Sequence, residues 1–499
     1  MTEHVAQTWL AVGCGVGLLL CGCAPIEHAP ELRQASDRLE RASGLQPAWE
    51  PEGGLREFQP DAEGVVALEH ALELALANNR ALRADLERIG EAKADLVQAG
   101  LLSNPMLNLM LRFPEAGGRA MFDFGLAQNL ADLWLIPSRR QAAQAMLQER
   151  LLAVTDTALG LIYEVRTTYS NLQYLSLAIE LEQQNLAILR EASEVAQARL
   201  RAGQGSQLDV NLLEGRRLET ELALLQLRSD QRITQQTLLR LMGVARAPDT
   251  WQPQPLTLHD APALAADEAK LIDAALVRRL DVLAAWWELE AAAADFQQQV
   301  LRFLPNLTIG VAGERTESRG LPERKILAEA WRSSLAAGRP TVPELETPSQ
   351  RRLERSQMID LLIGPALDVP LPIFDQNQAQ VAKAQYRTRE LRQRYEELEQ
   401  RVIEGVRAAL ATRRLAEDKV RVYRESLMPL QESNLRLAEA AYQAGRESIL
   451  TVLLAQEALI RTRLGHAAAA RDLAASAAGL ERQMAGRLSE IVGQEPEAK

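Results

Sequence analysis

The chain has 499 residues and is acidic, with 56 lysine and arginine residues against 67 aspartate and glutamate residues and a formal net charge of −11. This charge argues against nucleic acid as a partner. No segment after residue 22 holds enough consecutive apolar residues for a transmembrane helix, so any part of the chain that crosses a membrane is expected to cross as strands.

Residues 1–22 are expected to be a signal peptide, because the apolar run that ends at Leu20 is too short to span a bilayer. The following Leu20-Cys-Gly-Cys23 resembles a bacterial lipobox, which implies cleavage before Cys23 and lipidation of Cys23. Ala24 comes next instead of aspartate, which in that pattern implies sorting to the outer membrane. The residues before the apolar run contain no lysine or arginine, so an ordinary secretory peptide or another translation start are the alternatives.

Cysteine use agrees with this interpretation. Cys14 and Cys21 would leave with the signal peptide, and lipid on Cys23 would leave the mature chain without a free thiol. No disulfide, no cysteine-based metal site and no cofactor beyond the covalent lipid are therefore expected.

Residues 23–60 are rich in proline and lack periodicity, so we expect a lipidated, extended leader. Residues 61–101 have apolar residues at helical spacing, and Asn104-Pro105 ends the predicted helix.

Two segments with alternating apolar residues follow, at residues 107–113 and 122–130, and a glycine-containing turn at residues 115–118 separates them. Alternation over about 9–10 residues is typical of a transmembrane β-strand, with apolar residues toward lipid. An amphipathic hairpin on a soluble core is the alternative.

A long helical pattern then runs over residues 138–200, with apolar residues at coiled-coil spacing. Glycines at residues 203 and 205 end it, and residues 206–242 form a second helix that runs back. This unit is predicted to be a long helical hairpin.

The pattern repeats after a proline-rich linker at residues 243–265. Residues 266–301 are predicted to be helical, strands are expected near residues 307–312 and 361–369, and a second long hairpin is expected from residues 377–444 and 448–485. Pro429 should kink the long arm or mark a short break in it. Residues 313–358 are predicted to be an extracellular insert with a short helix near residues 327–335.

The duplication is clearest at the two hairpin turns. The glycine, serine and valine of the first turn recur in register at the second: Gly203, Ser206 and Val210 correspond to Gly445, Ser448 and Val452. We therefore divide the chain into a first repeat at 61–242, a second repeat at 266–486 and a C-terminal tail at 487–499.

The predicted fold is mainly α with a small β part. Four strands cannot close a barrel, and open strand edges in lipid leave backbone groups without partners. Since the smallest barrels need about eight strands, the barrel is expected to be shared, with three chains supplying twelve strands. The helices, roughly 100 Å long, would then extend into the periplasm as a helical barrel.

Over residues 60–490 the chain resembles the TolC-like outer membrane efflux proteins. The resemblance is carried by four motifs in order: Ala99-Gly-Leu-Leu-Ser-Asn-Pro105, Gly203-x-x-Ser206-x-Leu-Asp-Val210, Gly364-Pro-Ala-Leu-Asp-Val-Pro-Leu-Pro-Ile-Phe-Asp375 and Tyr442-x-x-Gly445-x-x-Ser448-x-Leu-x-Val-Leu453. It implies a trimeric exit duct in the outer membrane that exports small molecules or metal cations. A periplasmic adaptor and an inner-membrane pump of the resistance–nodulation–division type are the implied partners.

The resemblance also implies roles for the turns. Gly203 and Gly445 are expected to cap helices, with Ser206 and Ser448 as N-caps, and in the family these tips dock the adaptor. Asp209 and Tyr442 match family positions that close the periplasmic mouth. Glu447, Thr451 and Leu454 depart from the family pattern, so the family's acidic cation-binding ring is not expected here. Other gate contacts would join Arg199, Arg201 or Arg446 to Asp209 or Glu447.

The segment from Pro370 to Gln378 resembles the branch that serves heavy-metal cation pumps, although it is also the expected strand-to-helix corner. Type I protein secretion is the alternative within the channel class, and a lipid-anchored periplasmic coiled-coil scaffold is the alternative outside it. An enzyme is not expected, because the histidines are scattered and no HExxH, GxSxG or P-loop motif occurs.

Overall fold

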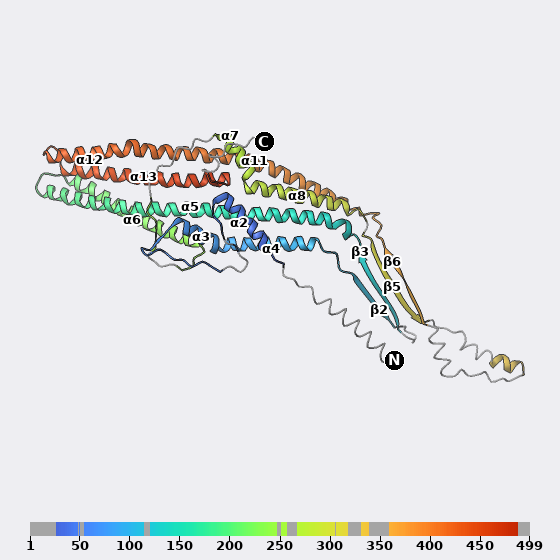
Figure 1. The fold of residues 1–499 in the computed structure, drawn as a ribbon. Coiled ribbons are helices and arrows are strands. Elements are labelled where there is room, and N and C mark those ends of the chain that lie inside the picture. The colour runs from blue at the N-terminus through green and yellow to red at the C-terminus, as the bar shows by residue number, and fades with distance from the viewer. Residues whose placement is uncertain are drawn as a thin grey trace. The chain divides into compact units, whose positions relative to one another are not determined.

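The computed structural model describes residues 26–47, 49, 54–113, 120–246, 251–256, 267–304, 306–317, 331–338 and 359–487 (Figure 1). It forms two compact units. The first is drawn from Met1–Asp95, Ala145–Glu290 and Glu390–Lys499, and the second from Leu96–Gln144 and Ala291–Arg389. The predicted signal peptide, Cys23, the turn at residues 115–118 and most of the predicted insert lie outside the described residues.

The order of helices shows the duplication. The first copy contains α3 (Leu68–Asn78), α4 (Arg80–Ala99), α5 (Asp132–Arg201) and α6 (Gln207–Leu241). The second contains α7 (Glu268–Arg278), α8 (Leu280–Leu301), α11 (Gln378–Val422), α12 (Met428–Gln443) and α13 (Ile449–Met484). In the part of the chain described here, no helix is both long and apolar enough to cross a membrane.

The predicted extended leader is wrong over much of its length, because Ala29–Ser43 forms the helix α2. Pro30 lies in its first turn, where a missing N–H group costs nothing. Leu32, Ala35 and Leu39 are buried at helical spacing. The prolines therefore delimit this helix and do not prevent it.

The helix predicted at 61–101 is two helices, α3 and α4, and the helix predicted at 266–301 is likewise divided into α7 and α8. The breaks fall at Asn79 and Arg279, whose ψ angles of 118° and 127° are extended. The Asn79 amide oxygen accepts a hydrogen bond from the Leu82 N–H group at 3.0 Å, which caps α4. Arg279 forms an ion pair with Asp281 at 2.7 Å. Each break is thus held by a local side-chain contact.

The break predicted at Pro429 is confirmed. The π-helical turn η1 (Tyr423–Leu427) separates α11 from α12, and Pro429 lies in the first turn of α12. Proline has no N–H group to donate, and a π turn is a common way to accommodate a disturbed hydrogen-bond ladder.

The linker contains a short strand that the sequence did not indicate. β4 (Gln252–Pro253) pairs in parallel with β1 (Val65–Val66). The Tyr169 hydroxyl lies beneath this pair, where it donates to the Val66 carbonyl at 2.7 Å and accepts from the Gln254 N–H group at 2.9 Å. Burial raises the pKa of Tyr169 to about 12. The linker is therefore anchored to the first long helix.

The second unit contains a four-stranded antiparallel sheet in the order β2–β3–β5–β6 (Figure 1). Its strands are Met106–Arg112, Met121–Asn129, Thr308–Glu317 and Ile359–Asp368. All four predicted strands are therefore confirmed. β5 extends further than expected, however, and residues 313–317 belong to the strand and not to the insert. Their charged residues indicated a loop, but their backbone pairs with β6 as far as Ile359. In the insert itself, residues 331–336 are helical.

The register of the sheet gathers the apolar residues on one face. Residues directly opposite each other in antiparallel strands point to the same side. Leu107 faces Leu126, Leu126 faces Val311, and Ile309 faces Leu367. The other face carries an ion pair of 2.9 Å between Arg112 and Asp123. The apolar face comprises Leu107, Leu109, Leu111, Phe122, Phe124, Leu126, Ile309, Val311, Leu361, Ile363, Pro365 and Leu367, with Gln128, Gly313 and Arg315 among them.

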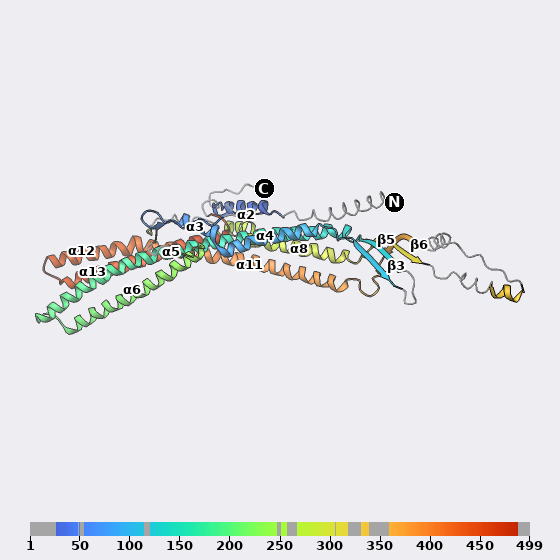
Figure 2. The same ribbon diagram turned by 90° about the horizontal axis from the view of Figure 1, so that it is seen from below.

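The helices of the first unit pack around two apolar clusters. One combines residues from α7, α8, α11 and α13, among them Leu271, Val282, Val406 and Leu480. The other lies near the hairpin turns and is described below. Figure 2 shows α12 and α13 running side by side, as they also do in Figure 1. The first cluster lies within the second repeat, whereas the second joins residues of both repeats.

Candidate functional site

The two hairpin turns have the same backbone geometry. Gly203 and Gly445 have φ angles of 72° and 67°, a conformation that costs other residues about 1–2 kcal/mol. At the first turn, the Gly203 N–H group donates to Leu200 and the Gln204 N–H group donates to Arg199.

The same two bonds recur at the second turn, where the Gly445 N–H group donates to Tyr442 and the Arg446 N–H group donates to Ala441. These paired bonds define a Schellman motif at each turn. An added Cβ would meet no atom within 4 Å at either glycine. The backbone conformation, and not lack of space, therefore requires glycine.

The helices that leave the turns are capped differently. The Ser206 hydroxyl accepts from the Asp209 N–H group at 3.1 Å, and the Asp209 carboxylate accepts from the Ser206 N–H group at 3.3 Å. This reciprocal capping box engages Asp209, a predicted gate residue, in a local structural role.

Ser448 occupies the corresponding N-cap position of α13, but its hydroxyl makes no capping bond. Thr451 stands where the first copy has Asp209, so no carboxylate is available to complete a capping box. The Thr451 hydroxyl donates instead to the Glu447 carboxylate at 3.0 Å. All four predicted tip residues therefore have the expected positions, and only the predicted cap by the Ser448 side chain is wrong.

The structure brings the beginning of α13 against the first hairpin. Leu453 belongs to a buried cluster with Leu189 and Ala192 of α5 and Val210 and Leu213 of α6, and Ile449 and Leu450 pack on its edge. The two turns, 242 positions apart in the repeat register, thus share one apolar cluster.

The remaining gate candidates are exposed. Tyr442 is 46% exposed, and Arg446 and Glu447 are exposed as well. In the part of the chain that the structure describes, no ion pair joins Asp209 or Glu447 to Arg199, Arg201 or Arg446. The Arg199 guanidinium makes only a long contact of 3.5 Å with the Gln204 carbonyl. Any gate made by these side chains therefore requires contacts beyond a single chain.

A buried carboxylate that the sequence did not single out lies on α13. Glu457 is joined to Arg216 of α6 at 2.9 Å and to Arg461 at 2.6 Å, and its side chain is only 6% exposed. Its repeat counterpart is Gly215, so the duplication gave no sign of it. A signal was present nonetheless, because Glu457 lies at heptad spacing between the apolar Leu453 and Ile460.

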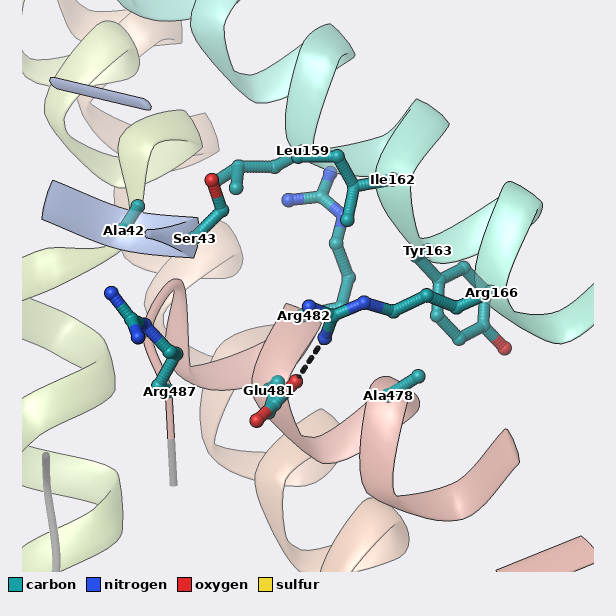
Figure 3. A pocket seen from close by; sticks show the side chains of 11 residues that line it. Ala42, Ser43, Leu159, Ile162, Tyr163, Arg166, Ala478, Glu481, Arg482 and Arg487 are labelled. Atoms are coloured by element: carbon teal, nitrogen blue, oxygen red, sulfur yellow. Dashed lines mark hydrogen bonds and ion pairs between the residues drawn. The ribbon is translucent and has the colours of Figure 1, made fainter. Parts of the chain in front are cut away.

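Near the other end of α13, ion pairs connect the last helix to the first long one. Arg166 of α5 pairs with Glu481 at 2.5 Å, and both oxygens of Asp156 accept from Arg482. Although burial acts to lower it, the bond to Asp156 raises the pKa of Arg482. Figure 3 shows the small pocket beside these side chains, with a volume of about 30 Å³. It has room for about one water molecule, so we interpret it as part of the packing.

No group of three or more histidine, cysteine, aspartate or glutamate residues is placed to hold a metal ion among the residues the structure describes. The Glu457 and Asp156 carboxylates are both engaged by arginine.

Comparison with known proteins identifies the chain. It matches the family described as outer membrane efflux protein over residues 71–244 and 271–486, which coincide closely with the two predicted repeats. It is 24% identical to nodulation protein T of Rhizobium leguminosarum bv. trifolii over 346 residues, covering 69% of this chain and 67% of that protein. It is also 24% identical to the cobalt-zinc-cadmium resistance protein CzcC of Cupriavidus metallidurans over 414 residues, covering 82% of this chain and 87% of that protein.

Solved structures have the same fold. The structure of CusC superposes with a TM-score of 0.63 at 19% identity, covering 89% of this chain and 98% of that chain. The open state of the MtrE outer membrane channel of Neisseria gonorrhoeae gives a TM-score of 0.62 at 18% identity, with the same coverage. The resemblance found in the sequence motifs is confirmed, and the chain belongs to the outer membrane efflux protein family.

Proposed function

We propose that this protein is the outer-membrane exit channel of a tripartite efflux pump. The observation that carries the proposal is the sheet of the second unit, which places exposed leucine, isoleucine, valine and phenylalanine on one face and mainly polar or small residues on the other, where Met106, Met110 and Leu362 are the large apolar exceptions. A membrane strand needs this separation, because one face meets lipid and the other meets a water-filled lumen. Membership of the efflux family supports the same function and points away from an enzyme.

The sheet requires partner chains to be complete in a membrane. Among the described residues, β2 and β6 each pair on one side only, so their outer edges present unpaired N–H and carbonyl groups. In lipid each such group would cost several kcal/mol. Three chains that join β2 of one to β6 of the next would close a barrel of twelve strands and leave no open edge.

The hairpin turns are the proposed docking sites for a periplasmic adaptor. Gly203, Gly445 and Ser206 set the turn geometry, and Ser448 occupies the matching N-cap position of the second turn. The solvent-exposed Tyr442, Arg446 and Glu447 are available to a neighbouring chain or an adaptor. Asp209, which caps α6, would help the gate by fixing the first turn.

Lipid on Cys23 would add an anchor in the outer membrane, with the helices in the periplasm. The pump is proposed to be of the resistance–nodulation–division type. The name of the relative CzcC, a cobalt-zinc-cadmium resistance protein, supports divalent metal cations as cargo, with other small molecules as the alternative.

Single-channel conductance in a planar bilayer tests the proposal. We expect discrete conductance steps from the detergent-purified trimer. An Arg446→Cys variant, modified with a bulky thiol reagent, should show altered steps, because the modified side chain would lie at the mouth of the conduit. A Glu87→Cys variant, exposed on α4, is the matched control and should not respond. A protein that forms neither a conducting pore nor a detergent-stable trimer would contradict the proposal.

A further inference from the structure

The corner between β6 and α11, at residues 369–377, exposes large apolar side chains to solvent. Leu371 is 73% exposed and Ile373 is 67% exposed, and Phe374, at 92%, is the most exposed large apolar side chain among the described residues. Contiguous exposed apolar residues mark a site of contact with another protein or with a membrane. A connection from a strand to a helix does not by itself require such residues.

The backbone of this corner is held in a fixed conformation. Pro370 and Pro372 have restricted φ angles and keep the residues before them extended. Further along, Asn377 has a positive φ of 61°, and its side-chain amide donates to the Gln299 carbonyl of α8 at 2.7 Å. The Asn377 N–H group also donates to the Asp375 carboxylate at 2.9 Å. A fixed backbone therefore presents the apolar side chains to the outside.

Other strands of the sheet end at the same place. In the sheet register, Asn129 lies opposite Thr308, and Thr308 lies opposite Asp368. The end of β3, the beginning of β5 and the end of β6 are therefore at one end of the sheet. The connections next to these strand ends contain large apolar residues that are 44% to 92% exposed. We call this set the apolar rim: Leu133, Phe303, Leu304, Leu371, Ile373 and Phe374.

The apolar rim continues the apolar face of the sheet. Leu367 belongs to that face and is 63% exposed, and Val369, two residues further along extended backbone, lies on the same side. Leu371 follows after the same interval. Beyond the rim the chain becomes polar again, at the exposed Asp375 and Gln376. Along the chain, the apolar sheet face is thus followed by the apolar rim and then by a polar surface.

The distribution of the rim favours lipid over a protein partner. A neighbouring chain would meet the sheet at its edge strands, β2 and β6, whereas the rim also lies at the ends of the central strands β3 and β5. Lipid surrounds a membrane barrel and meets every strand, and such barrels carry aromatic residues where the membrane ends. Arg302 is exposed next to Phe303 in the chain. An arginine there can keep its charge among lipid phosphates while its stem lies along apolar surface.

We propose that the apolar rim inserts into the boundary between headgroups and acyl chains in the periplasmic leaflet of the outer membrane, and that it fixes the depth of the sheet in the bilayer. This inference rests on the proposed function, because it requires the sheet to lie in a membrane. It adds the position at which the membrane ends and the side chains that hold the protein there. The partner is a lipid surface.

Fluorescence quenching of a labelled cysteine in liposomes of phosphatidylethanolamine and phosphatidylglycerol tests the proposal. Phe374→Cys, in the full-length protein, carries an environment-sensitive fluorophore. We expect spin-labelled lipid to quench it about threefold more strongly than aqueous iodide does, since a rim residue lies below the headgroups. Leu109→Cys, on the apolar sheet face, is the reference for insertion of the sheet and should also be quenched by lipid. Leu437→Cys, 66% exposed on α12, is the matched control and should respond to iodide alone.

The two labels separate the failure of this inference from the failure of the proposed function. Quenching of the Phe374→Cys label by iodide, with the Leu109→Cys label quenched by lipid, would place the rim in water and overturn the inference while the channel stands. Iodide quenching of both labels would overturn both proposals. A Phe374→Cys label that neither reagent reaches would be covered by protein, which would also overturn the inference. The native protein, taken through the same labelling, is the blank.

A second measurement tests whether the rim fixes the depth of the sheet. The Leu109→Cys label is quenched by lipids with the spin label near the headgroup or deep in the acyl chain. Ile373→Ser/Phe374→Ser should change the ratio of the two quenching efficiencies about twofold, because the sheet loses its anchor at the boundary. Tyr386→Ser, which removes a 67% exposed aromatic residue of α11 outside the rim, is the control and should leave the ratio unchanged. An unchanged ratio in the rim variant would contradict the depth-setting role.

Discussion

The Glu457 carboxylate on α13 lies 2.9 Å from the Arg216 guanidinium on α6, so one ion pair joins the two sequence repeats across 241 residues. Glu457 also accepts from Arg461 at 2.6 Å and is nearly inaccessible to water. A carboxylate in this position depends on its arginines, because a buried charge without a partner is strongly destabilising. The pair therefore helps to hold α13 against the first hairpin.

Removing Arg216 should measurably loosen this junction. We expect Arg216→Ala to lower the free energy of unfolding in urea by about 1.5–3 kcal/mol, the range for a hydrogen bond to a charged group. Arg190→Ala is the control, because the Arg190–Glu221 pair is longer and more exposed. Its loss should cost no more than about 1 kcal/mol. Equal losses of unfolding free energy in Arg216→Ala and Arg190→Ala would show that the burial of Glu457 does not strengthen its ion pair.

The turn glycines give a second prediction. Gly445→Ala and Gly203→Ala should each destabilise their hairpin by about 1–2 kcal/mol, because both positions have positive φ. Hydrogen exchange of the backbone around each turn should rise locally. Gly215→Ala, in the interior of α6 and with no atom near an added Cβ, should instead stabilise the protein by up to about 1 kcal/mol. If Gly215→Ala destabilised the protein, an added methyl group would be unfavourable even in a helix interior, and the losses at Gly203 and Gly445 could not be assigned to their positive φ angles.

Much of the architecture could be predicted from local patterns. The strands and long helices have strong periodicity, and the turns at Gly203 and Gly445 carry residues whose conformational preferences are specific. The helix α2 was missed because proline is a reliable signal only in a helix interior, whereas Pro30 lies in the first turn. The break at Arg279 was missed because apolar spacing continues through it.

The candidate site was harder to predict, for a physical reason. The turn positions are set by local backbone conformation, which the sequence encodes within a few residues. Heptad spacing indicates that Glu457 faces a neighbouring helix, but its pairing with Arg216 depends on how distant helices pack, which no local pattern encodes. Even Ser448, in the expected position, lacks its side-chain cap, because the Thr451 N–H group donates to the Ser448 carbonyl oxygen at 3.0 Å and not to its hydroxyl.

The ends of α6 and α13 give a third prediction. Gly243 has a φ of 67°, and its repeat counterpart Ala485 has a φ of 45°. A left-handed conformation strains alanine but not glycine. Ala485→Gly should therefore stabilise the protein by about 1 kcal/mol, after allowance for the greater freedom of glycine in the unfolded chain.

The converse change, Gly243→Ala, should be clearly destabilising, because its new Cβ would lie 2.3 Å from the Asn78 carbonyl oxygen in addition to the strain. Urea unfolding of both variants checks the pair, and the same sign for both changes would contradict the argument.

The half-buried His466 of α13 gives the last prediction, which concerns pH. The centroid of its ring lies 6.3 Å from the centroid of the Tyr423 ring, which belongs to the π turn η1. Burial, and after it the positive charge of Arg424, lower the pKa of His466 below the ordinary value of about 6.5. The unfolded chain therefore binds a proton at a higher pH than the folded chain does.

It follows that the contribution of neutral His466 to stability is fully present above about pH 6.5 and is lost as the pH falls toward the lower pKa of the folded state. Unfolding of the native protein between pH 8 and pH 5 should show this loss. His466→Gln, which cannot take up the proton, should flatten the profile in that window. Arg424→Gln removes only the smaller of the two causes that lower the pKa of His466. The stability of this variant should therefore still fall with falling pH, but less steeply than that of the native protein. A profile that His466→Gln leaves unchanged would mean that another group near the π turn takes up the proton.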